Sequence, residues 1–312
     1  MPAVAIEHAL AMGLVLIAIV SSAVAMAHVS YYGVSLQVEG IAANAYAVEQ
    51  TVFTTLRCTH GLNCLDVDKL DALSSTYQEA NSSLFTAYTT FLAEAGIKDN
   101  EFHLWVSSGL NVSAVWMNSS ISVSVLQPFT QQGVAAGIVA YIFNGNHVVE
   151  TIYGETNTQG AGLVQPTQDG VILVFASSGA SVGFAFVSGI VTPATDSTGV
   201  YVEGGQLLPQ GSRPSSYFIF SRDGYTGPIT TGMVDVSGYS LPVAVAWKDN
   251  AVNPFVIRVL SYPHFPIDYG APVSSTGFTL ITSATVQGSI IKVKLQVWGS
   301  AGQVLMLEGM GL

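Results

Sequence analysis

The stretch ALAMGLVLIAIVSSAVAMA, residues 9–27, decides how this sequence is interpreted. Only Ser21 and Ser22 interrupt its apolar side chains, and no Asp, Glu, Lys or Arg occurs between Glu7 and Glu39. As an α-helix with a rise of about 1.5 Å per residue, the stretch spans roughly 28 Å. That length is close to the ~30 Å hydrocarbon core of a bilayer, so we expect a helix that can lie in a membrane.

Other interpretations of this stretch stay open. A cleaved secretory signal is one, since Ala25-Met26-Ala27 supplies a cleavage site, but no basic residue precedes the apolar run. A permanent membrane anchor is a second, although no cluster of Lys or Arg flanks either end to set its orientation. The core helix of a globular domain is a third, and such helices are normally shorter.

Helical character continues without proline to Leu56, with apolar residues at helical spacing and polar residues between them. We therefore expect one long helix of about 70 Å, apolar in its first half and amphipathic in its second. A monomer cannot bury such a rod, but a bundle of identical rods can, and its small residues let helices approach closely. The side chains expected in the core of that bundle are Leu10, Leu14, Leu16, Ile17, Ile19, Val20 and Val24.

This apolar start, followed directly by a strand-rich chain, resembles the archaeal type IV pilin-like proteins, which include pilins, archaellins and adhesive-fibre subunits. The resemblance covers residues 1–56 and, in general character, the remainder; the size is similar to that of large surface-fibre subunits of hyperthermophilic crenarchaea. Glu7 resembles the glutamate near the mature N-terminus of pilins, or is simply a favourable acidic residue in a first helical turn. No leader ending in a basic residue plus Gly or Ala precedes the run, so a mature or nearly mature chain is expected.

The composition favours an extracellular protein. Charged residues make up 9% of the 312-residue chain, against ~25% in an average soluble protein. The net charge is −11 and there is no basic stripe, which argues against nucleic-acid binding. Cys58 and Cys64 are spaced for a small disulfide loop, with two free thiols as the alternative. Three Asn-x-Ser sequons indicate a glycosylated face, with acceptors at Asn81, Asn111 and Asn118.

Residues 57–100 are expected to hold the disulfide loop and a second helix. That helix is predicted to begin at Asp66 or Asp68, since aspartate is a good N-cap, and to end near Gly96. Asp66, Asp68 and Asp71 lack the spacing of a calcium-binding loop. We therefore interpret this acidic group as the solvated start of the helix.

From residue 101 to 312 the sequence is strand-like almost throughout. Its runs are rich in β-branched and aromatic residues, and most are bounded by Gly, Pro, Asn or Asp. No helical pattern separates the runs, so we expect antiparallel sheets packed as an Ig-like or more elaborate sandwich, in one head or two subdomains. The predicted fold class is α+β: a long N-terminal apolar helix followed by a mainly antiparallel β-sandwich head.

One segment matches the nucleophile elbow of serine hydrolases. Gly179-Ala180-Ser181-Val182-Gly183 follows a strand-like run, and Asp235 or Asp249 and then His264 come later, in the chain order of such a triad. An elbow requires a helix directly after the serine, but the following FAFVSGIV is strand-like, so a hairpin turn is favoured. Since no phosphate-binding loop, dinucleotide fingerprint or metal-ligand spacing is found, no catalytic residue, cofactor or metal is predicted.

The favoured function is a structural subunit of an extracellular cell-surface filament, used for adhesion or motility, and not an enzyme. Residues 1–56 would form the filament core after leaving the cytoplasmic membrane, 57–100 the linking segment and 101–312 the outer head. The expected partners are further copies of the chain in a helical homopolymer, the membrane before assembly, and surfaces or other cells. Two alternatives stay open: a membrane-anchored monomeric binding protein or adhesin with a β head, and a secreted hydrolase that uses Ser181.

Overall fold

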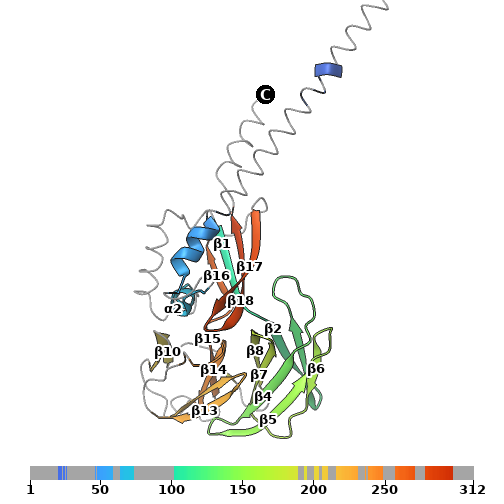
Figure 1. Cartoon of the computed structure of the whole chain (residues 1–312). Coiled ribbons are helices and arrows are strands. Elements are labelled where there is room, and N and C mark those ends of the chain that lie inside the picture. The colour runs from blue at the N-terminus through green and yellow to red at the C-terminus, as the bar shows by residue number, and fades with distance from the viewer. Residues whose placement is uncertain are drawn as a thin grey trace, which may run out of the picture.

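Strands dominate the fold (Figure 1). A computed structural model describes residues 20–22, 24, 26, 46, 48–58, 64–73, 102–188, 193–194, 200–203, 206–209, 216–230, 236, 238–248, 257–270 and 278–297. Helical residues in this part of the chain precede the strands, and the helix α2 comprises Val67–Ala72.

The described strands form four sheets. The large sheet has eight strands, in the order β16 (Ile267–Gly270), β1 (Phe102–Ser108), β18 (Ser289–Val297), β8 (Ser181–Ser188), β7 (Val171–Ser178), β4 (Gly137–Phe143) and β5 (Val148–Glu155), with β17 (Phe278–Val286) also paired to β18. The five-stranded sheet has the order β13 (Gly224–Ile229), β12 (Tyr217–Ser221), β14 (Val243–Lys248), β15 (Ile257–Tyr262) and β9 (Pro193–Ala194). The three-stranded sheet contains β2 (Asn111–Met117), β3 (Ser120–Leu126) and β6 (Ala161–Val164), and β10 (Val200–Glu203) pairs with β11 (Gln206–Pro209). The paired strands are antiparallel except for β15 with β9 and the single bridge between β18 and β8.

The central strands β4 and β7 are buried on both faces. One face of each joins a hydrophobic cluster with the three-stranded sheet, and the other face joins a cluster with β12, β14 and β15. Because side chains alternate along a strand, a strand with two buried faces must be apolar at almost every position. The runs GIVAYIF (137–143) and VILVFA (171–176) have this property.

Strands β12 and β14 repeat this arrangement one layer further on. Phe218 and Phe220 of β12 face β4 and β7, while Tyr217 and Ile219 point the opposite way, into a cluster with β1 and β18. The five-stranded sheet therefore lies between two parts of the large sheet, one with β1 and β18 and the other with β4 and β7. The three-stranded sheet covers the outer face of β4 and β7 (Figure 1).

The expected fold class is wrong. The described residues form a β-rich fold with short helices, and they contain no long apolar helix. Residues 48–56 are helical, but Val52 and Leu56 are buried against β1 and β18, so their apolar face packs within the same chain instead of continuing a rod. Outside the described residues lie Glu7 and five of the side chains predicted for the core of the helix bundle, Leu10, Leu14, Leu16, Ile17 and Ile19.

The second helix begins where the sequence predicted. Asp66 is the N-cap of α2, and its side chain accepts hydrogen bonds from the backbone N–H groups of Asp68 and Lys69 at 3.0 and 3.3 Å. The expected continuation of this helix to Gly96 lies outside the described residues. Among the helices that are described, none is both long and apolar enough to cross a bilayer.

Close packing between β8 and the turn before β2 gives the first testable prediction. A Cβ on Gly183 would overlap the carbonyl oxygen of Leu110, and β8 cannot shift freely because it is paired with β7 along its length. We predict that Gly183→Ala lowers the free energy of unfolding by about 1–3 kcal/mol, as overpacking usually does. The measurement is urea denaturation of the two proteins.

Gly238→Ala is the matched control, because a Cβ at Gly238 meets no atom within 4 Å. It should change the free energy of unfolding by less than about 0.5 kcal/mol. Equal effects of the two substitutions would contradict the close approach at Gly183.

Candidate functional site

The described part of the apolar N-terminal stretch is helical and exposed. Val20 and Val24 each expose 52% of their surface, and Met26 exposes 72%. Val20 and Val24 are four residues apart, so they lie on the same face of a helix. Exposed apolar side chains that form a contiguous patch are a feature of surfaces that bind other molecules.

The chain that follows this stretch is attached to the head. Val52 and Leu56 are each only 2% exposed and belong to the cluster that contains β1 and β18. The ring centroids of Tyr46 and Phe278 are 6.3 Å apart, and Phe278 is the first residue of β17. The residues around 46–56 therefore pack on the same strands that close the large sheet.

The disulfide predicted between Cys58 and Cys64 is present. It closes a loop in which the N–H of Cys58 also donates to the carbonyl of Cys64 at 3.1 Å. The N–H of Leu65 then donates to the carbonyl of Thr285 in β17 at 2.9 Å. Cys64 and Leu65 are thus held against the same strand as Tyr46.

The acidic group at the start of α2 is not solvated as expected. Asp71 is fully buried, and its carboxylate accepts the backbone N–H of His264 at 2.7 Å and lies 2.8 Å from Nδ1 of the same residue. Asp68 accepts a hydrogen bond from the Tyr262 hydroxyl at 3.0 Å. These contacts fasten α2 to the end of β15 and to the loop that follows it.

The buried pair changes the protonation of its histidine. Burial alone lowers the pKa of His264, but the negative charge of Asp71 and the hydrogen bonds to it outweigh burial and raise the pKa above its usual 6.5. Burial, together with Asp68 and Asp71, also raises the pKa of Tyr262, so its hydroxyl stays neutral. The Nε2 of His264 is buried without a hydrogen-bond partner among the described residues, which fits a structural pair better than an acid–base catalyst.

Ser181 lies on a hairpin and not on a nucleophile elbow. Gly179 and Ala180 form the turn between β7 and β8, and Ser181 pairs with Ser178 as the first residue of β8. Since strand continues from Ser181 to Ser188, no helix N-terminus follows the serine. The hairpin predicted for this segment is confirmed, whereas the candidate triad residues Asp235 and Asp249 lie outside the described part of the chain.

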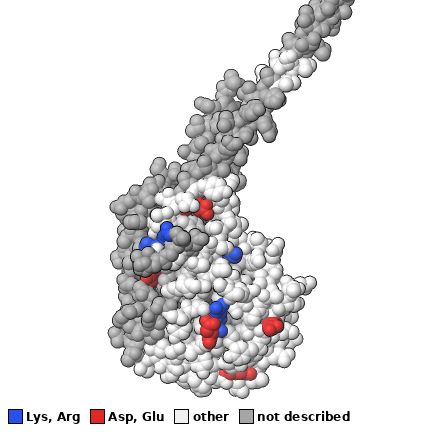
Figure 2. Space-filling view, in the orientation of Figure 1, with Lys and Arg blue, Asp and Glu red and all other residues white. Residues whose placement is uncertain are grey.

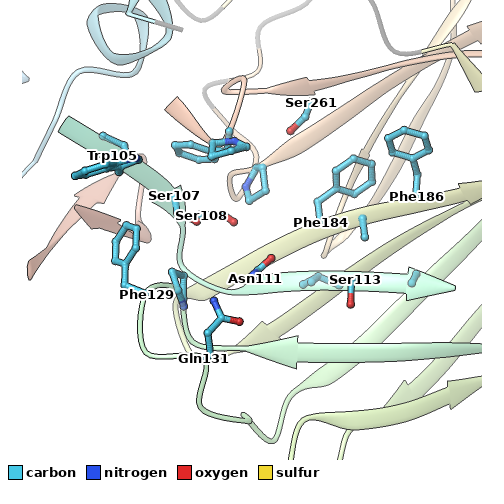
Figure 3. Close-up of a pocket in the computed structure, with 18 residues that line it drawn as sticks. Trp105, Ser107, Ser108, Asn111, Ser113, Phe129, Gln131, Phe184, Phe186 and Ser261 are labelled. Atoms are coloured by element: carbon cyan, nitrogen blue, oxygen red, sulfur yellow. The ribbon is translucent and has the colours of Figure 1, made fainter. Parts of the chain in front are cut away.

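A groove of about 620 Å³ opens on the head (Figure 3). Trp105 and Phe129 lie at one end of it, and Phe184 and Phe186 at the other (Figure 3). No described residue that lines it is charged. Its hydroxyl and amide side chains are Ser107, Ser108, Asn111, Ser113, Gln131 and Ser261.

The aromatic end of the groove at Trp105 is held by its neighbours. The ring of His103 stacks on the indole with 3.8 Å between ring centroids, and Nζ of Lys294 lies 4.5 Å from the indole centroid. Cation–π and stacking contacts of this kind restrict the orientation of the ring. The indole therefore belongs to a preformed part of the groove.

Two of the three sequons fall within the described residues. Asn111 is exposed at the start of β2 and lines the groove, whereas Asn118 is exposed in the β2–β3 turn, with a φ of 57°. Asn81 lies outside the described part. Charged side chains are few and scattered among the described residues on the face shown in Figure 2, so uncharged residues make up most of that face.

Comparisons with protein-family models, with curated proteins and with solved structures found no match. Within the described ranges, no three His, Cys, Asp or Glu side chains gather as a metal ion would require. Two features are left as candidates for function: the exposed apolar stretch around Val20 and Val24, and the uncharged groove.

The His264–Asp71 pair predicts how stability depends on pH. A histidine whose pKa is raised by folding stabilises the fold fully below its unfolded pKa of about 6.5, and this contribution is lost as the pH rises through the raised value. We predict that His264→Gln lowers the free energy of unfolding by about 3–5 kcal/mol just below pH 6.5, where the wild-type histidine is protonated, because the substitution leaves the buried Asp71 carboxylate unpaired. The difference from the wild type should shrink as the pH is raised.

Urea denaturation of both proteins over a pH series measures this difference. His147→Gln is the control, because His147 is exposed and should give a difference near zero throughout. A His264→Gln effect that grew with pH would contradict the assignment.

Proposed function

We propose that this chain is a structural subunit of an extracellular, type IV pilus-like filament that polymerises through its apolar N-terminal stretch. The observation that carries the proposal is the exposed apolar surface at Val20, Val24 and Met26, in a chain whose head already has hydrophobic clusters of its own. Further copies of the chain offer matching apolar surface. Its burial between subunits contributes about 25 cal/mol per Å² removed from water.

The proposal does not require a continuous long helix. It requires that residues 9–27 of one subunit contact those of its neighbours, with small residues such as Ser21 and Ser22 allowing close approach. Before assembly, the same stretch would hold the subunit in the cytoplasmic membrane. Extraction from the membrane then exchanges lipid contacts for contacts between subunits.

The head would form the outer layer of the filament. It has few charged residues, a feature that suits contact with surfaces or other cells. Adhesion is favoured over motility because the head is large. The groove also favours a second candidate function, a membrane-anchored monomeric binding protein, which predicts detergent-soluble monomers with ligand-dependent melting.

A charge in the apolar stretch tests the proposal. We predict that Val24→Glu abolishes filaments, because an unpaired carboxylate buried between subunits is strongly unfavourable. Leu16→Glu, in the middle of the stretch, should act in the same way. Negative-stain electron microscopy of material sheared from cells gives the measurement, and circular dichroism checks that the head is folded.

The matched control is Val115→Glu, since Val115 is 60% exposed on β2 of the head. This variant should form filaments. If both Val24→Glu and Leu16→Glu formed normal filaments, the apolar stretch would not be the part of the chain that joins the subunits.

A further inference from the structure

One sequon lies inside the groove. Asn111 and Ser113 are its acceptor and its hydroxyl residue, and both line the groove along the exposed face of β2. They are two residues apart on a strand, so their side chains point to the same side. Figure 3 shows both between the two aromatic ends. A sugar joined to the Asn111 amide nitrogen would therefore begin within the groove.

The groove has the chemistry that a neutral sugar needs. A sugar ring presents C–H groups on its faces and hydroxyl groups around its edge. Phe129 and Phe184, on opposite sides of Asn111 along the groove, offer flat apolar surfaces, and serine and glutamine side chains offer donors and acceptors. No described residue that lines the groove is charged, and the Lys294 ammonium lies against Trp105 at one end only. Over most of the groove an ionic ligand would therefore be desolvated without a countercharge.

We propose that this groove is the seat of a neutral N-linked oligosaccharide carried by Asn111 of the same chain. Its volume of about 620 Å³ falls in the range of about 300–1,000 Å³ typical of small-molecule sites. The covalent link keeps the sugar at a high effective concentration, so individually weak contacts suffice to hold it. The glycan fills the groove and stiffens the junction of β1, β2 and β8.

The link forms by glycosyl transfer from an activated lipid-linked glycosyl phosphate, on a separate transferase. The Asn111 amide nitrogen bonds to the anomeric carbon while the bond from that carbon to the phosphate oxygen breaks. The phosphate leaves with the electron pair, and the amide nitrogen loses one proton. The proposal shares only the extracellular location with the proposed function and is independent of polymerisation.

Asn118 provides a comparison within the same chain. It belongs to the neighbouring sequon and is exposed in the β2–β3 turn, but it does not line the groove. A glycan at Asn118 would extend into solvent. Loss of the two glycans should therefore have different effects on the stability of the head.

The test uses the full-length chain from its native source. Mass spectrometry of peptides measures occupancy at Asn111, and calorimetry measures the Tm of the variants Asn111→Gln, Ser113→Ala, Ser113→Thr and Asn118→Gln. We expect Asn111 to be occupied. Asn111→Gln and Ser113→Ala, which both remove its sequon, should lower the Tm by about 2–4 °C. Ser113→Thr, which keeps the sequon, should keep Asn111 occupied, and Asn118→Gln should leave the Tm unchanged.

Two results would overturn the proposal. One is a bare Asn111 in the native chain; binding of added neutral oligosaccharide by that chain would then assign the groove to a foreign glycan. The other is an Asn111 that carries a glycan, combined with an unchanged Tm when Ser113→Ala removes that glycan. The glycan would then project into solvent. If the chain forms filaments but Asn111 carries no glycan, only the proposal of a glycan in the groove is contradicted. If the chain is glycosylated at Asn111 but stays monomeric, only the proposed filament function is contradicted.

Discussion

Strands β4 and β7 need an apolar layer on each face, because alternate residues of both strands point to opposite sides of the large sheet. The three-stranded sheet supplies one layer and β12, β14 and β15 supply the other. The polar tip of Tyr141, buried in this stack, donates to the carbonyl of Ser221 at 3.0 Å. Burial, with smaller effects of neighbouring residues, raises the pKa of Tyr141 to about 12, so it stays a neutral donor.

The same constraint draws the N-terminal part of the chain into the head. Strands β12 and β14 are also apolar on both faces, and their second face is covered by β1 and β18 together with Val52, Leu56, Leu70 and Leu73. The chain around 46–56 and α2 therefore complete a core that begins in the sheets. In a filament, force applied to the apolar stretch would reach the head through these packed residues and through the Cys58–Cys64 loop.

The sequence was most informative for features that depend on residues close together along the chain. The strand-like runs, the Cys58–Cys64 disulfide, the Asp66 cap and the hairpin at Ser181 all follow local rules. The long helix was wrong because helical periodicity shows an apolar face but not its partner; Val52 and Leu56 find theirs in the head. Asp71 and His264 are 193 residues apart, and the groove draws on several separate segments, so no local pattern indicated either.

Whether the apolar stretch joins copies of this chain is measured most directly by electron microscopy of filaments sheared from cells. Mass spectrometry of the same material identifies the subunit and its N-terminus. A role of the apolar stretch in assembly predicts filaments made of this chain, with residues 9–27 retained and located at the filament axis. Recovery of the protein only as single particles from detergent-extracted membranes would contradict it.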